Sequence, residues 1–153
     1  MVSDKTKELV EEGIALLKEG AAIDAVFHFE KIIQEHGRNT AALSFLGLAT
    51  ARANGDLSVA EKHCLRALRR QKLIPLYYQN LAEVYLAGGK KAQAVKVLRE
   101  GLSVDRNNKL ILRQLRELGV RKKLPVSFLS RSNPINRYLG LLHNKKTPGR
   151  RMK

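Results

Sequence analysis

The sequence predicts an all-α protein in which paired helices stack into a solenoid. Small residues recur in register about every 34 residues, in two series: Gly13, Gly47 and Ala82, then Ala25, Ala60 and Ala94. A repeat of this length, built from helix pairs, is typical of solenoid proteins. Because solenoids present extended concave surfaces to other molecules, the repeat favours a binding module.

Length and composition are consistent with one domain followed by a tail. The chain has 153 residues, 44% of them hydrophobic, which is enough to form a core. No apolar run approaches the roughly 18 residues that a membrane span needs, and the charged N-terminus does not resemble a secretory signal. The single cysteine fits a reducing compartment. We therefore expect a cytoplasmic protein.

The net charge of +15 is unevenly placed along the chain. Residues 1–40 carry five Lys/Arg and eight Asp/Glu, whereas residues 118–153 carry ten Lys/Arg and no acid. A basic, acid-free end indicates an anionic partner such as nucleic acid, an acidic protein or a membrane surface. A plain solubilising tail is the alternative.

The first helical hairpin is predicted over residues 4–19 and 22–36. Gly20 ends the first helix, and Gly37 ends the second. In each helix the apolar residues have the spacing of one helical face: Leu9, Val10, Ile14, Leu16 and Leu17, then Ala25, Val26, Phe29, Ile32 and Ile33.

The second hairpin is predicted over about 39–53 and 57–71, with a turn at Asn54-Gly55-Asp56. The third begins at Pro75, whose missing N–H costs nothing in a first helical turn. Its first helix ends at Gly88-Gly89, and its second covers about 91–103. A seventh helix is predicted over about 108–118. Small residues in register let the paired helices pack closely, with larger apolar residues filling the space between them.

These positions together resemble the tetratricopeptide repeat (TPR) over about residues 6–108. The matching residues are Leu9, Gly13, Leu16, Ala25 and Phe29 in the first copy, Leu43, Leu46, Gly47, Ala60, Cys64 and Ala67 in the second, and Tyr78, Leu81, Ala82, Tyr85, Ala94 and Leu98 in the third. The resemblance implies a right-handed solenoid of three hairpins (6–39, 40–74 and 75–108), a capping helix (109–118) and a C-terminal extension. The domain would then cover 1–119 and the extension 120–153.

The resemblance also implies a binding groove, because in this family the first helix of each pair lines the concave face. That lining maps onto Lys7, Val10, Ile14, Leu17, Ala41, Ser44, Leu48, Arg52, Leu76, Gln79, Glu83 and Leu86. The best-known TPR subclass holds an acidic C-terminal peptide with a Lys/Asn/Arg clamp. Of the corresponding residues here, only Asn80 could take such a role. We therefore expect a hydrophobic or amphipathic peptide segment as the protein partner.

The C-terminal extension carries more apolar residues than a solvated linker needs. Asn133-Pro134 predicts the start of a short helix over 134–143. The candidate docking residues are Phe128, Leu129, Ile135, Tyr138, Leu139 and Leu142. This segment either folds back onto the solenoid and occludes the groove, or docks on a partner. Fold-back is favoured because a tethered segment has a high effective concentration.

The sequence predicts neither catalysis nor a metal or cofactor. Its four histidines lack metal-ligand spacing, and Cys64 occupies a core position of the repeat. Basic residues cluster in two helices, at Arg66, Arg69, Arg70 and Lys72 and at Lys90, Lys91, Lys96 and Arg99. The leading interpretation is a non-catalytic protein-interaction module. The alternatives are a nucleic-acid- or ribosome-associated accessory protein, and attachment to an anionic membrane through the tail.

Overall fold

The computed structural model describes residues 4–37 and 39–120, and within these ranges it contains seven α-helices and no strand. The helices are α1 (Asp4–Glu19), α2 (Ala22–His36), α3 (Thr40–Arg52), α4 (Leu57–Arg70), α5 (Pro75–Ala87), α6 (Lys91–Val104) and α7 (Lys109–Glu117). The predicted all-α class is confirmed, and each predicted helix lies within about one residue of its observed bounds. Contacts within the chain group residues 1–119 into one compact unit that ends at Gly119.

Local polar groups account for several of the helix starts. The side chains of Asn39, Asp56 and Asn108 accept hydrogen bonds from the first-turn amides of α3, α4 and α7, at 2.9, 2.7 and 3.1 Å. Such caps satisfy amides that have no partner inside the helix. Pro75 occupies the first turn of α5. The turn before α4 contains Asn54 with φ of 56°, a left-handed conformation that asparagine tolerates.

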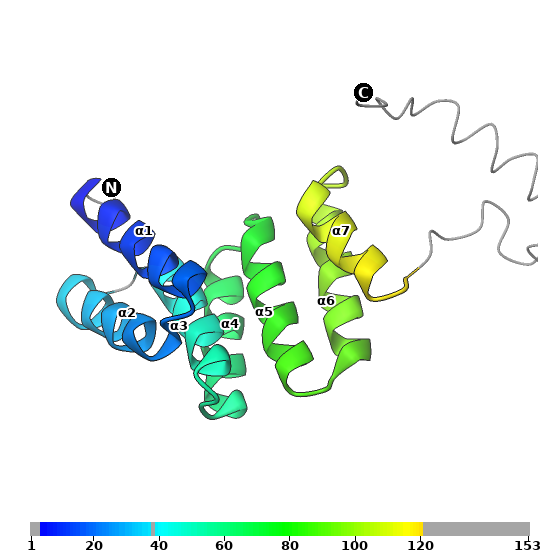
Figure 1. Cartoon of the computed structure of the whole chain (residues 1–153). Helices are drawn as coiled ribbons and strands as arrows, with labels where there is room; N and C mark the ends of the chain where they lie inside the picture. Colours follow the sequence, from blue (N-terminus) through cyan, green and yellow to red (C-terminus); the bar gives the residue numbers. More distant parts are fainter. Residues whose placement is uncertain (1–3, 38, 121–153) are drawn as a thin grey trace, which may run out of the picture. The chain divides into compact units, whose positions relative to one another are not determined.

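The helices form three consecutive hairpins, α1/α2, α3/α4 and α5/α6, with α7 packed on α6 (Figure 1). Every helix contacts the next one along the chain. The first helices of the hairpins also contact one another, α1 with α3 and α3 with α5. The second helices α2, α4 and α6 lack comparable contacts with one another. First helices that approach closely while second helices splay apart curve the array, with α1, α3 and α5 on the inner side.

Helix α3 lies at the centre of this array. It contacts α1, α2, α4 and α5, and all of residues 42–49 are buried. Phe45 stacks on Phe29 of α2, with ring centroids 5.8 Å apart and planes 14° from parallel. These two rings belong to a cluster of buried residues that combines side chains of α1, α2 and α3.

Helices α3 and α4 approach each other closely at Gly47. A Cβ built on this residue would lie 2.5 Å from the Cys64 sulfur and 2.6 Å from the Ala60 carbonyl oxygen. Cys64 itself is fully buried, as the sequence predicts. Burial, with a smaller contribution from Glu61, raises the pKa of its thiol to about 12. The series of small residues therefore marks a true backbone contact between α3 and α4.

Gly47→Ala tests this contact. We expect it to lower the free energy of unfolding by about 1–3 kcal/mol, because a backbone oxygen cannot rotate away from the new methyl group. Helix propensity alone predicts a gain of up to about 1 kcal/mol instead. Denaturant unfolding followed by circular dichroism shows whether the substitution lowers or raises the free energy of unfolding, and so which of these two effects is larger.

Gly88→Ala is the matched control, because the nearest atom to its added Cβ would be 3.4 Å away, an ordinary contact. We expect it to change the free energy of unfolding by less than about 0.5 kcal/mol. If the two substitutions change the free energy of unfolding equally, the close contact between α3 and α4 at Gly47 does not disfavour a larger residue there.

Candidate functional site

The residues predicted to line the groove divide into an accessible set and a packed set. Lys7, Arg52 and Leu76 are exposed, while Ile14, Ala41, Glu83 and Leu86 are half-buried. The others are buried, with exposures between 0% and 7%: Val10, Leu17, Ser44, Leu48 and Gln79. Their assignment to a partner-binding groove stays a prediction, but only the accessible set has surface to offer a partner without a rearrangement.

Arg52 ties the three first helices together at one end of the face. Its guanidinium donates to the Glu83 carboxylate of α5 at 2.6 Å and to the Leu17 carbonyl of α1 at 3.3 Å. The two side chains of the ion pair are 42% and 33% exposed. An ion pair this exposed contributes little stability, so a ligand could compete for either partner at modest cost.

The middle of the face is closed by a buried polar contact between α3 and α5. The Asn80 amide donates to the Ser44 hydroxyl at 3.0 Å, and Asn80 is only 2% exposed. The Ser44 carbonyl in turn lies 3.5 Å from the Cys64 sulfur, which donates to it. Asn80, the one residue that matched the acidic-peptide clamp, is therefore engaged in holding α3 against α5.

The opposite end of the face opens into a pocket of about 380 Å³ between α1, α3 and α5. Its walls include Lys7, Val10 and Ala41, and Tyr77 of α5 forms part of the far side. The Tyr77 hydroxyl donates to the Gln71 side chain at 3.1 Å, which leaves the ring as an apolar wall. Leu76, next to Tyr77, is 39% exposed. This end combines accessible apolar surface with a concave shape.

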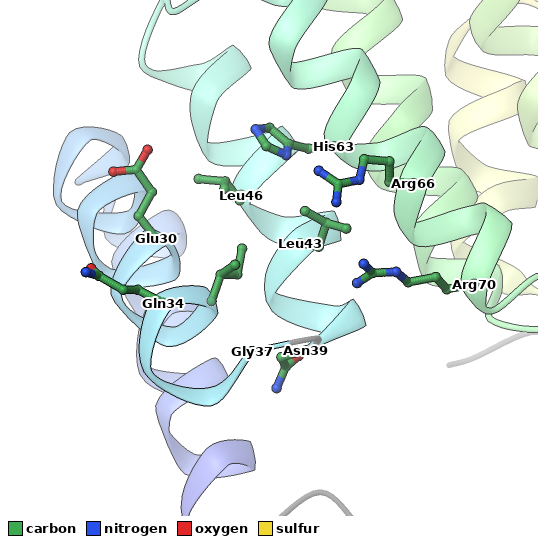
Figure 2. Close-up of a pocket in the computed structure, with 10 residues that line it drawn as sticks. Glu30, Gln34, Gly37, Asn39, Leu43, Leu46, His63, Arg66 and Arg70 are labelled. Carbon is green, nitrogen blue, oxygen red and sulfur yellow. The ribbon is translucent and has the colours of Figure 1, made fainter.

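The second-helix side holds two equivalent grooves. The α2–α4 groove, of about 590 Å³, has Glu30 and Gln34 of α2 on one wall, Leu43 and Leu46 of α3 on its floor, and His63, Arg66 and Arg70 of α4 on the other wall (Figure 2). The α4–α6 groove, of about 430 Å³, has the same form one repeat later. Four residues line it from α4 and the turn after α4: Leu65, Leu68, Arg69 and Lys72. They lie 35 positions after Glu30, Ile33, Gln34 and Gly37, which line the first groove.

His63 stands at the α4 wall of the first groove. Its Nδ1 atom is buried and has no hydrogen-bond partner among the described residues. Desolvation by burial, and then the positive charge of Arg66, lower the pKa of this imidazole. His63 is therefore neutral at pH 7, and the positive charge of this wall comes from its arginines.

The sequence predicts the basic cluster of α4, but it does not predict that the α2–α4 groove is a site. The sequence feature that could have indicated this groove is an apolar pair on α2, Ile23 and Phe27. The pair lies off the core-facing stripe of the helix and is 63% and 66% exposed. The equivalent positions hold Ser58 and Lys62 in the second repeat, and Ala92 and Lys96 in the third. Comparison of the repeats with one another could have found the pair.

The candidate docking residues Phe128, Leu129, Ile135, Tyr138, Leu139 and Leu142 lie outside the described residues. Across the part that is described, no group of three or more His, Cys, Asp or Glu side chains could hold a metal ion. In the same part, no helix is both long and apolar enough to cross a membrane.

Stacked helical hairpins with an inner face of first helices define the TPR fold, and comparison with solved structures confirms it. The first TPR of Spaghetti (RPAP3), solved with the HSP90 peptide SRMEEVD, superposes with a TM-score of 0.62 at 23% identity, covering 76% of this chain and 92% of that one.

Two further TPR domains agree with this fold. The first TPR domain of human RPAP3 gives a TM-score of 0.64 at 22% identity, covering 74% of this chain and 89% of that one. The Sgt2 domain of Aspergillus fumigatus gives 0.60 at 13% identity, covering 88% and 95%. Neither a protein-family model nor a curated protein sequence matches the chain.

The buried Ser44–Asn80 contact can be tested by Asn80→Ala. We expect a loss of about 1–3 kcal/mol in the free energy of unfolding, because the Ser44 hydroxyl keeps no side-chain partner in the core. Ser44→Ala should also destabilise, and the double variant should cost less than the sum of the two. Strictly additive losses in denaturant unfolding would show that the hydrogen bond contributes nothing.

Proposed function

We propose that this TPR-fold protein is a non-catalytic interaction module whose inner face binds a hydrophobic or amphipathic peptide segment. The observation that carries the proposal is the open end of that face, where the Tyr77 ring borders a pocket between three helices and the neighbouring Leu76 is 39% exposed. The pocket has apolar walls from Val10, Ala41 and Tyr77, and its lining also includes the polar Lys7, Glu11, Asn39, Thr40 and Gln71. Such a mixed surface suits an amphipathic segment better than a purely acidic tail. The neighbours of similar fold support peptide binding in general, since one of them was solved with a peptide.

The peptide is proposed to differ in chemistry from the HSP90 segment bound by that neighbour. SRMEEVD ends in acidic residues, and their recognition needs cationic or amide donors on the face. Here Asn80 is buried against Ser44, and Arg52 is paired with Glu83. The Asn80 amide and the Arg52 guanidinium are therefore held in contacts within the fold.

The first occupant that we propose is the chain's own extension. Residues 124–143 carry the six apolar docking residues, and because they belong to the same chain their binding to the face would need no second molecule. In this proposal the extension covers the inner face until a segment of a partner protein displaces it.

A labelled synthetic peptide of residues 124–143 tests this proposal. It should bind a chain truncated to residues 1–123 saturably, as measured by fluorescence anisotropy, and bind the full chain more weakly because the attached copy competes. Leu76→Lys should weaken binding by about tenfold, in line with the transfer free energy of one leucine side chain. Leu110→Lys, at an exposed leucine on α7, is the control and should leave affinity unchanged.

Equal affinity of the peptide for the truncated and full chains would contradict self-occlusion. Failure of the peptide to bind either chain would contradict fold-back altogether. In that case apolar-dye binding and hydrogen exchange in α1, α3 and α5 should also be the same in both chains.

The alternative, an anionic partner such as nucleic acid on the basic face, rests on the exposed Arg66, Arg69 and Arg70 of α4. None of the three forms a hydrogen bond or ion pair with another described residue in the structure. If this function operates, affinity for an RNA oligonucleotide should fall steeply with added salt. Groove binding of an apolar peptide should not. A salt-independent affinity for RNA would contradict the electrostatic alternative.

A further inference from the structure

The α2–α4 groove carries charges of opposite sign on its two walls. Glu30 is on α2, and Arg66 and Arg70 are on α4, and all three are exposed (Figure 2). No hydrogen bond or ion pair joins them to each other or to another described residue. The groove therefore separates unpaired charges of both signs by an apolar floor of Leu43 and Leu46, both at least 95% buried.

An apolar ridge stands beside this groove. Phe27 and Ile23 lie about one and two turns before Glu30 on α2, and each exposes more than 60% of its surface. On α4, Val59 lies one turn before His63 and is 39% exposed. The fold does not require these side chains, because the next repeat has Ser58 and Lys62 in place of Ile23 and Phe27. Adjacent exposed apolar residues at positions where the fold accepts polar ones mark an interaction surface.

We propose that this surface is an interface between two copies of the chain, with α2 of each copy lying along the α2–α4 groove of the other. A two-fold axis brings the same patch of both molecules together, so the patch must be complementary to itself. The α2–α4 groove meets this requirement. One surface carries the exposed apolar side chains of α2, a groove with an apolar floor, the acidic Glu30, and two arginines.

In this arrangement Phe27 and Ile23 of each copy cover the floor of the partner's groove. Glu30 of each copy lies near Arg66 and Arg70 of the other. Glu30, Arg66 and Arg70, which have no described partner within one chain, would then each have an oppositely charged neighbour in the other copy. The apolar ridge of Ile23 and Phe27 would be removed from contact with water. The two-fold symmetry repeats each of these contacts on both sides of the axis.

Charge decides between a second copy and the chain's own extension as the occupant. Residues 118–153 contain ten Lys/Arg and no acid. Placed in this groove, they would set like charges against Arg66 and Arg70, which opposes association. The acidic residues of a second α2 have the sign that the α4 wall needs.

Sedimentation equilibrium of the full chain tests the proposal. The average mass should rise with protein concentration from 17.2 kDa towards twice that value. The dimer should weaken, but not vanish, as salt screens the charged walls. A monomer mass at every concentration would overturn the proposal.

Ile23→Ser/Phe27→Lys identifies the surface, because it inserts the residues that the second repeat carries at the equivalent positions. The dimer dissociation constant should rise at least about tenfold, while circular dichroism and unfolding stay as in the parent. Leu110→Lys is the matched control for an exposed apolar residue elsewhere and should dimerise normally. Unchanged dimerisation of the double variant would overturn the proposal, because the copies would then meet through another face.

A charge swap tests the pairing across the axis. Glu30→Arg and Arg66→Glu should each weaken the dimer, and the two together should restore most of the lost affinity with reversed polarity. Arg69→Glu makes the same charge change on the wall of the α4–α6 groove and should have little effect. Failure of the double swap to recover affinity would overturn the proposed pairing of α2 with α4.

Discussion

Helix α3 contacts α1, α2, α4 and α5, and residues 42–49 have almost no exposed surface. A helix surrounded in this way can carry only apolar, small or internally satisfied side chains. Gly47 gives the room for close approach to α4, Phe45 stacks on Phe29, and Ser44 accepts from Asn80. The orientations of the hairpins on both sides of α3 depend on these contacts, and so do the surfaces that they present.

The burial of α3 has a consequence for binding. Because the centre of the inner face is closed by Ser44, Leu48 and Asn80, accessible surface lies at its ends and in the grooves between second helices. The inner face offers a pocket with both apolar and polar walls at the Tyr77 end and an ion pair at the Arg52 end. The second-helix side offers grooves with charged walls. The two occupants that we propose differ accordingly: an apolar or amphipathic segment on the inner face, and a second copy of the chain on the second-helix side.

Much of the fold could be predicted because its signals are local. Helix bounds follow from apolar periodicity and from residues that begin or end helices, such as Asn39, Asp56, Pro75 and Gly20. The burial of Cys64 and the contact at Gly47 follow from the register of the repeats, since equivalent positions in a solenoid have equivalent neighbours. The candidate site was predictable only in part. The first helices do form the inner face, but periodicity cannot tell whether Leu48 or Leu76 on such a face meets a neighbouring helix or solvent.

The amino-acid sequence by itself determined the all-α class, the three hairpins and the capping helix, because each depends on spacings within a few turns of chain. Only the tertiary structure decided which lining residues remain accessible, because that depends on how closely α1, α3 and α5 approach one another. It also decided that Asn80 is used internally, and that Glu30 faces Arg66 and Arg70 across an apolar floor. These residues lie more than 30 positions apart, so their chemistry becomes a shared surface only when α2 and α4 are packed against the same helix.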